Sequence, residues 1–246
     1  MRTTWDFAGT RALVAGGGGI GAAVARALAE AYADVVVLDV DKDRLDDTVR
    51  DGVTGVVADL ASPAACRTAV TEAVRILGGL DVFVHAVGVN DRRPVLETPD
   101  EVWERLLAVN LSSAFWLGRA AGAVMVPNGY GRVVYLSSVS GLLAHRDHAP
   151  YAATKGGVNQ LMRVMAREWA AAGVTVNAVA PGYTETDLTR AYLAKPGMRA
   201  SMESLVPAGR LGRPEDLTGP VLFLASAESA FVTGQVLYAD GGRTLV

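Results

Sequence analysis

Short runs of β-branched and other apolar residues alternate along the chain with longer segments in which apolar residues recur at helical spacing. Several of the short runs are continuously apolar, which is typical of strands covered by helices on both faces. The expected strands are Ala12–Val14, Val35–Leu38, Gly55–Val57, Val82–Val84, Arg132–Leu136, Val174–Val179 and Val236–Tyr238. The expected helices include Gly21–Tyr32, Pro63–Leu77, Val102–Val126, Ala149–Ala171 and Pro214–Ser226.

Seven strands with helices between them predict an α/β protein built on a doubly wound, seven-stranded parallel sheet with helices on both faces, the Rossmann fold. No linker, repeat or low-complexity tract divides the chain, so residues 1–246 are expected to form a single domain. One polar segment, 184–213, contains Pro196, Gly197 and Pro207 and is too long for an ordinary connection. We expect this insert to act as a substrate lid or specificity loop.

The composition narrows the classes of partner. Half of the residues are hydrophobic, enough for a large core, while 23 basic and 26 acidic residues give a net charge of −3 without any charged block. This balance argues against nucleic acid or a membrane surface as a partner. The longest stretch without Asp, Glu, Lys or Arg, Trp169–Thr184, is interrupted by Pro181 and Gly182. The only cysteine, Cys66, excludes an internal disulfide and a Cys-based zinc site, so we expect no metal and a reduced, cytoplasmic setting.

A glycine-rich turn follows the first expected strand and leads into a helix of small residues. It runs from Gly16 through Gly19 and continues as Ile20 and Gly21. Such glycines let the backbone approach a pyrophosphate, which the helix N-terminus then binds through free N–H groups. Asp39 closes the second strand and can accept hydrogen bonds from ribose hydroxyls. A tight turn and a solvated carboxylate are the ordinary alternatives, but in this order the two features favour a dinucleotide site.

Tyr151 and Lys155 lie four residues apart and therefore share one face of an expected helix. Ser138 follows the fifth strand, at the sheet edge where such folds bind ligands. A nearby ammonium and a nicotinium cation would lower the pKa of the tyrosine, which normally titrates near 10. Tyr151 would then exchange a proton with a substrate hydroxyl while hydride moves to or from a nicotinamide, and Ser138 would hydrogen-bond the substrate oxygen. Only the joint spacing makes these common residues informative.

These motifs resemble those of the short-chain dehydrogenase/reductase family, and the likeness covers essentially the whole chain. Further ordered matches are Asp59-Leu60, Val109-Asn110-Leu111, Asn177–Gly182, Gly212–Asp216 and Asp240–Gly242. The resemblance implies that Asn110 completes a catalytic tetrad with Ser138, Tyr151 and Lys155 and anchors a proton-relay water. It also implies the following dinucleotide contacts: Gly16, Gly19, Ile20, Gly21, Asp39, Asp59, Leu60, Gly88, Tyr151, Lys155, Pro181, Gly182, Thr184 and Thr186.

Two segments depart from the family pattern. Ala15 replaces a threonine, and only Gly17 and Gly18 separate Gly16 from Gly19, so the glycine turn is one residue short. The usual Asn-Asn-Ala-Gly after the fourth strand is His85-Ala86-Val87-Gly88, which removes two asparagines that brace the central sheet. We expect His85 to be a structural rather than a catalytic histidine, because Tyr151 already serves as the acid/base.

The predicted function is oxidoreduction between a secondary alcohol and a ketone with NAD as cofactor. Asp39 would repel the 2′-phosphate of NADP, the glycine turn has no side chain, and Lys42 after the second strand is outnumbered by Asp41 and Asp43, so NADP is less expected. The polar loops Asn90–Arg93 and His145–His148 favour a small hydroxylated substrate, including one with a carboxylate that an arginine would bind. Solvated loop charges or subunit contacts are the alternative. A 3-oxoacyl-thioester reductase and a non-catalytic dinucleotide sensor are the competing functions.

The family resemblance also implies a homotetramer. Its subunits would pair through the long helices 102–126 and 149–171 and through contacts near the C-terminus. Trp103, Phe115 and Trp116 would suit such an interface or, equally, the core of one chain.

Overall fold

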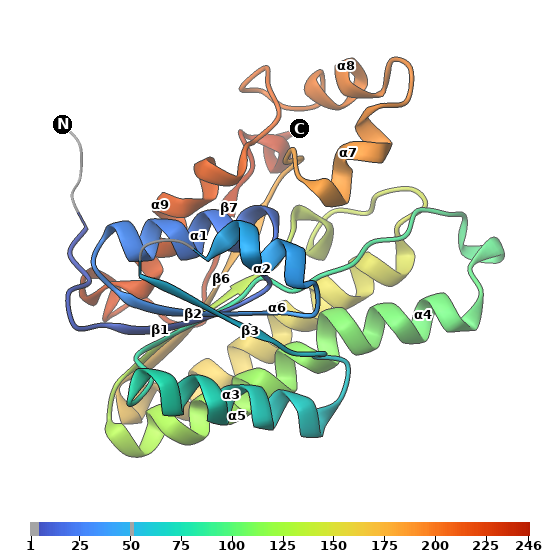
Figure 1. The fold of residues 1–246 in the computed structure, drawn as a ribbon. Coiled ribbons are helices and arrows are strands. Elements are labelled where there is room, and N and C mark those ends of the chain that lie inside the picture. The colour runs from blue at the N-terminus through green and yellow to red at the C-terminus, as the bar shows by residue number, and fades with distance from the viewer. Residues whose placement is uncertain (1–4, 50–51) are drawn as a thin grey trace.

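The computed structural model describes residues 5–49 and 52–246, and these residues contain a sheet of seven parallel strands with helices on both faces (Figure 1). The strands lie in the order β3-β2-β1-β4-β5-β6-β7. The predicted Rossmann fold is therefore confirmed. The strand bounds are β1 (Arg11–Ala15), β2 (Asp34–Asp39), β3 (Val53–Val57), β4 (Val82–His85), β5 (Gly131–Leu136), β6 (Val174–Pro181) and β7 (Val236–Ala239).

Two groups of helices cover the sheet. One face is packed by α1 (Gly19–Glu30), α2 (Lys42–Thr48) and α9 (Thr218–Ala225), and the other by α3 (Pro63–Leu77), α5 (Ser113–Asn128) and α6 (Ala149–Trp169). The helix expected over 102–126 begins earlier, as α4 (Asp100–Leu106), and passes through a π-helical turn at Leu107–Ser112 before α5. No helix in the described part of the chain is both long enough and apolar enough to span a bilayer.

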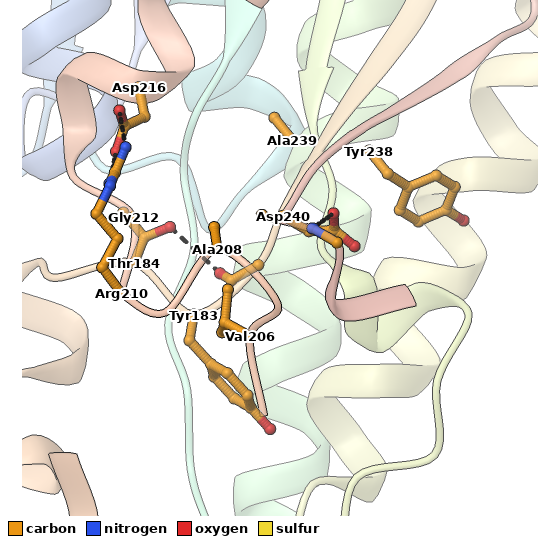
Figure 2. Close-up of a pocket in the computed structure, with 13 residues that line it drawn as sticks. Tyr183, Thr184, Val206, Ala208, Arg210, Gly212, Asp216, Tyr238, Ala239 and Asp240 are labelled. Carbon is orange, nitrogen blue, oxygen red and sulfur yellow. Dashed lines mark hydrogen bonds and ion pairs between the residues drawn. The ribbon is translucent and has the colours of Figure 1, made fainter. Parts of the chain in front are cut away.

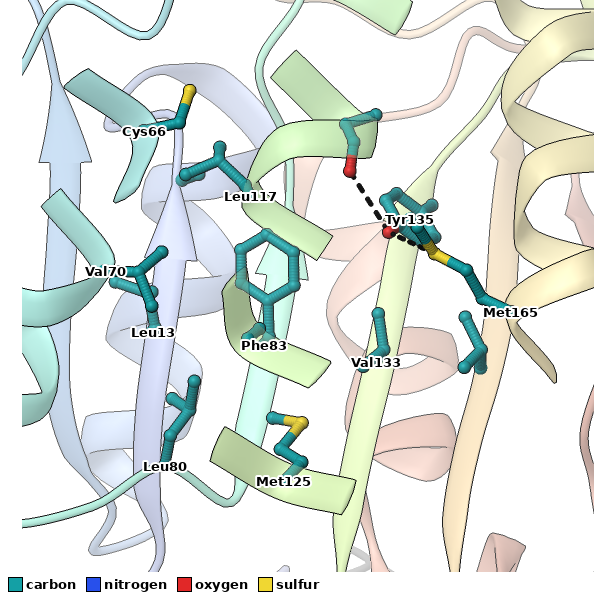
Figure 3. Close-up of a cluster of buried hydrophobic side chains, with 14 of the residues drawn as sticks. Leu13, Cys66, Val70, Leu80, Phe83, Leu117, Met125, Val133, Tyr135 and Met165 are labelled. Carbon is teal, nitrogen blue, oxygen red and sulfur yellow. Dashed lines mark hydrogen bonds between the residues drawn. The ribbon is translucent and has the colours of Figure 1, made fainter. Parts of the chain in front are cut away.

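Side chains alternate along β1 between the two cores. Ala12 and Val14 pack with α1 and α9, while Leu13 and Ala15 face α3 and α5. Figure 3 shows the second core, in which Tyr135 donates from its buried hydroxyl to the Ala114 carbonyl at 3.2 Å. Burying both faces leaves only the strand ends open to a ligand.

Some aromatic side chains on the outer helices are not buried. Trp103 and Phe115 are 41% and 39% exposed, so they do not belong to the core of one chain, which was the alternative to a subunit interface. Cys66, by contrast, is fully buried, and burial raises the pKa of its thiol to about 11.

The strand order reverses between β1 and β4, so the connections that leave these two strands run in opposite directions across the sheet. Open α/β sheets bind ligands in the crevice that forms at such a point, outside the carboxyl ends of the strands. The glycine turn, Asp39, Ser138 and Pro181 all stand at or directly after carboxyl ends of strands. The topology therefore gathers the predicted site residues at one edge.

The insert 184–213 rises above this edge of the sheet (Figure 1). A bridge between Thr184 and Gly212 closes its base, and it contains α7 (Asp187–Leu193) and α8 (Met198–Glu203). The insert is thus an ordered helical excursion, and its role as a lid stays a prediction.

Candidate active site

A cavity of about 580 Å³ opens at the carboxyl edge of the sheet, between the glycine turn, the ends of β5 and β6 and the insert. Ser138, Tyr151 and Lys155 line it, and so does every predicted dinucleotide contact except Gly21. The sequence-predicted residues therefore converge on one cavity. Gly21 and Asn110 lie behind its wall.

The glycine turn allows close backbone contacts that larger residues would prevent. Gly16 has φ +104°, and a Cβ there would lie 2.8 Å from the carbonyl carbon of Ala86. A Cβ on Gly21 would collide with the Gly16 carbonyl oxygen at 2.0 Å, so Gly21 is needed for packing. Helix α1 begins at Gly19 without a side-chain cap, which leaves its first N–H groups able to bind a phosphate. The shortened turn therefore still fits a dinucleotide.

An acidic residue at the end of β2, Asp39, and a basic residue in α2, Arg44, lie near the glycine turn. The Asp39 carboxylate accepts from the backbone N–H groups of Gly17, at 2.7 Å, and Asp41, at 2.9 Å. The Arg44 side chain lies over Gly18 and its Nε is 3.3 Å from the Asp41 carboxylate. Arg44 also lines the cavity. Only Lys42 was considered after β2, and Arg44 is an additional cation beside the glycine turn that was not predicted.

Helix α6 presents Tyr151 and Lys155 to the end of β5. Lys155 donates from Nζ to the Leu136 carbonyl at 2.8 Å and lies 5.6 Å from the centre of the Tyr151 ring. Burial lowers the pKa of Lys155 to about 8. Burial also raises the pKa of Tyr151, and this effect outweighs the lowering by Ser138 and by the charge of Arg92. The lowering expected from the sequence is therefore not produced by the protein's own groups.

Asn110 lies in the π-helical turn and is fully buried. Its Oδ1 accepts from the Val89 N–H at 2.8 Å, and its Nδ2 donates to the Val89 carbonyl at 2.9 Å and to Thr154 at 3.2 Å. These bonds fix the loop that carries Gly88, where a Cβ would lie 3.7 Å from Lys155 Nζ. Asn110 thus positions the backbone beside Lys155, and its water-anchoring role stays a prediction.

His85 stands outside the cavity, at the end of β4. Its Nε2 is 2.9 Å from the Ser113 hydroxyl, which in turn donates to the Val109 carbonyl. Burial, reinforced by the charge of Lys155, lowers the pKa of His85 to about 3, so the ring is neutral. This contact braces the sheet against the start of α5, the structural role favoured by the sequence.

Only some of the polar loop residues face the cavity. His148 stacks on Tyr151 at 4.9 Å between ring centres and donates from Nε2 to the Asn90 side chain at 2.9 Å. His145 and Arg92 also line the cavity. Arg93 instead pairs with Asp91, and Arg146 is 93% exposed. Arg92 thus lines the cavity, whereas its neighbour Arg93 does not.

A second cavity, of about 370 Å³, lies between the base of the insert and the loop after β7 (Figure 2). Its polar groups pair with one another: Arg210 binds Asp216 at 2.6 Å, and Asp240 accepts from the backbone of Gly242 at 2.9 Å. It contains none of the predicted catalytic residues. Within the described residues, no group of three His, Cys, Asp or Glu is placed to hold a metal ion.

The fold and the first cavity define a class: an α/β oxidoreductase with a dinucleotide crevice and a serine, tyrosine and lysine at its inner end. The sequence matches the family profile described as "Enoyl-(Acyl carrier protein) reductase" over residues 14–244. It is 36% identical to galactitol 2-dehydrogenase (L-tagatose-forming) from Cereibacter sphaeroides, over 99% of this chain and 98% of that protein. It is 35% identical to a 3-oxoacyl-acyl-carrier-protein reductase from Escherichia coli, over 98% of this chain and 100% of that protein.

A solved structure of a gluconate 5-dehydrogenase from Burkholderia cenocepacia, in complex with NADP and tartrate, superposes with a TM-score of 0.92 at 36% identity, covering 99% of this chain and 98% of that one. The chain therefore belongs to the short-chain dehydrogenase/reductase family.

Proposed function

We propose that the protein is an NAD(P)-dependent dehydrogenase that interconverts a secondary alcohol and a ketone on a small polyhydroxylated substrate. The observation that carries this proposal is a single cavity lined by Ser138, Tyr151 and Lys155, in which His148 stacks on Tyr151 and Asn90, Arg92 and His145 supply further polar groups. The similar galactitol and gluconate dehydrogenases are named for substrates of this class.

The dinucleotide would lie along the cavity, with its pyrophosphate at the glycine turn and its ribose hydroxyls at Asp39. When bound, it supplies the hydride acceptor or donor. Ser138 and Tyr151 would hold the substrate oxygen, and Tyr151 would take the hydroxyl proton during oxidation. Lys155 is held in place by the Leu136 carbonyl. Because burial raises the pKa of Tyr151, a positive charge beside the ring would be needed to favour its phenolate.

We propose NAD(H) as the preferred cofactor, with a modest margin. The Asp39 carboxylate opposes a 2′-phosphate, whereas Arg44 would partly offset it. Arg44 is in turn paired with Asp41, which reduces its effect. Two similar gluconate 5-dehydrogenase structures contain NADP, so they do not favour NAD(H), and the proposed preference rests on Asp39.

The second candidate is a 3-oxoacyl-thioester reductase, which the similarity to the E. coli enzyme favours. An acyl chain would have to lie against the polar wall formed by Asn90, Arg92 and His145. That contact would desolvate polar groups without replacing their hydrogen bonds.

We also propose a homotetramer, with the exposed Trp103 and Phe115 at the interface between helices of neighbouring subunits. The insert 184–213 would cover the substrate, since Thr186 and Leu188 line the cavity.

The test is cofactor reduction by the wild-type protein with galactitol, D-glucitol, D-gluconate, a cyclic alcohol and a hydroxysteroid, and cofactor oxidation with acetoacetyl-thioester. We expect the highest kcat/KM with a polyol or a sugar acid. A preference for the thioester or the steroid would overturn the proposal. Cofactor binding without turnover of any substrate would support the sensor function instead.

A further inference from the structure

The end of the cavity next to Tyr151 holds a histidine with one unused nitrogen. The Nδ1 atom of His145 is 2.9 Å from the Ser140 hydroxyl, and the ring packs against Tyr183 at 5.6 Å. Its Nε2 is buried and has no hydrogen-bond partner among the described residues. Leaving a buried polar atom unpaired is unfavourable, so such an atom on a residue of a cavity wall points to a ligand.

Arg92 brings a cation to the same wall. Its guanidinium lies 4.1 Å from the centre of the Tyr192 ring, on α7 of the insert. Within the described residues it has no carboxylate partner, in contrast to Arg93, which pairs with Asp91. Arg92 lines the same cavity as Tyr151, His145 and His148, and after the larger effect of burial its charge also lowers the pKa of the two histidines. The cation is therefore free to bind an anion beside the acid/base.

The acidic residues of the cavity do not neutralise this end. Asp39 and Asp59 follow β2 and β3, at the side of the sheet away from Tyr151. Asp187 pairs with Arg190. Burial lowers the pKa of His145 most, and the positive charges of Arg243 and Arg92 lower it further. The local charge thus favours a negatively charged group on the substrate.

We propose that Arg92 and His145 form a carboxylate subsite, and that the substrate is a polyhydroxylated acid whose carboxylate they bind while a secondary hydroxyl lies at Ser138 and Tyr151. A carboxylate offers the guanidinium two oxygens and can also accept from His145 Nε2–H. This inference rests on the proposed function, because it names the substrate class of the same site.

The test compares matched substrates that differ only in the charged group: D-gluconate with D-glucitol, and D-galactonate with galactitol. The wild type should have a higher kcat/KM for the acid of at least one pair. In Arg92→Leu the ratio of kcat/KM for acid to polyol should fall about 30-fold, which corresponds to about 2 kcal/mol. His145→Phe keeps the ring but loses the nitrogen, and should lower the ratio in the same direction.

Two control variants separate the subsite from other roles of the same residues. Arg93→Leu removes a neighbouring positive charge outside the cavity and should leave the ratio unchanged. Tyr192→Leu removes the aromatic partner of Arg92 but keeps its charge. If Arg92 acts only by holding the insert in place, Tyr192→Leu and Arg92→Leu will both lower kcat/KM for the acid and for the polyol of a pair by the same factor. That result would overturn the subsite.

Binding without turnover provides an independent measurement. The NADH complex cannot accept a hydride, so calorimetric titration with D-gluconate or D-galactonate reports binding alone. We expect an acid to bind the wild-type complex and to lose about 30-fold in affinity in Arg92→Leu. Polyols preferred over both acids, or acid binding unchanged in Arg92→Leu, would overturn the subsite while leaving the proposed function intact. Failure to oxidise any polyol or acid would instead refute the proposed function.

Discussion

Removing the negative charge of Asp39 should weaken the preference for NAD(H) over NADP(H). The carboxylate is buried at the end of β2, where it accepts from Gly17 N–H at 2.7 Å. Asp39→Asn removes the charge that faces a 2′-phosphate and keeps one oxygen, which can accept from the Gly17 N–H, while its amide group replaces the oxygen that accepts from the Asp41 N–H. The ratio of the two cofactors separates the two effects, because a loosened turn would weaken NAD and NADP alike.

The size of the effect follows from Coulomb's law. Two unit charges about 4 Å apart interact by about 4 kcal/mol at an effective dielectric constant of about 20. The open cavity and the nearby Arg44 reduce this repulsion, and we take about 2 kcal/mol as the net value, which is a factor of about 30 in specificity. Arg44→Gln should change the preference in the opposite direction, by only a few-fold, because its side chain is half exposed and paired with Asp41.

The assay is kcat/KM for each cofactor at a fixed, saturating alcohol concentration. Asp39→Asn should lower the NAD-to-NADP ratio about 30-fold, and Arg44→Gln should raise it. Asp43→Asn is the matched control, because Asp43 lies in α2 next to Arg44 but does not line the cavity. An unchanged ratio in Asp39→Asn, or equal kcat/KM for both cofactors in the wild type, would refute the assignment of Asp39 as the discriminating residue.

Three further predictions concern the catalytic residues and the core. Tyr151→Phe should lower kcat by a factor of about 10² to 10⁴ with little change in cofactor affinity, and more than about a tenth of wild-type activity would contradict its role as acid/base. Lys155→Met should impair both kcat and cofactor affinity, as measured by fluorescence titration with NADH; unchanged affinity would leave Lys155 without a role in binding. Unfolded histidine binds a proton near pH 6.5 but folded His85 only near pH 3, so the free energy of unfolding should fall as pH falls through this range. His85→Asn should make this dependence shallower by about 1.4 kcal/mol per pH unit in denaturant titrations, and an equal slope would count against a buried neutral ring.

The sheet and its larger helices could be predicted because their signals are local. The expected helix Pro63–Leu77 agrees at both ends with α3, which Ser62 caps and Gly78 terminates with φ +73°. Helix α2 was missed because Lys42–Thr48 is almost entirely polar and has no apolar stripe. That omission also hid Arg44, whose position against the glycine turn depends on the helix.

The membership of the site could be predicted more fully than its chemistry. The positions of Ser138, Tyr151 and Lys155 along the chain predicted that they lie in one cavity, as they do. It could not show that Lys155 donates to a main-chain carbonyl or that burial decides the direction of the Tyr151 pKa. These properties depend on depth and on partners distant in sequence.

The composition of the loops also could not predict which charged residues line the cavity. Arg92 and Arg93 are neighbouring residues of the same type, but Arg93 pairs with Asp91 whereas Arg92 lines the cavity.

The central claim is that Tyr151 catalyses hydride transfer between the carbinol carbon of a polyhydroxylated substrate and a nicotinamide. The most direct measurement is a single turnover with D-gluconate or galactitol deuterated at its secondary carbinol positions, followed by mass analysis of the cofactor. We predict that the reduced nicotinamide gains one deuterium in the wild type, and that this transfer is lost in Tyr151→Phe although the cofactor still binds. A cofactor that stays unlabelled with both substrates in the wild type, or a variant that transfers the label at the wild-type rate, would contradict the account.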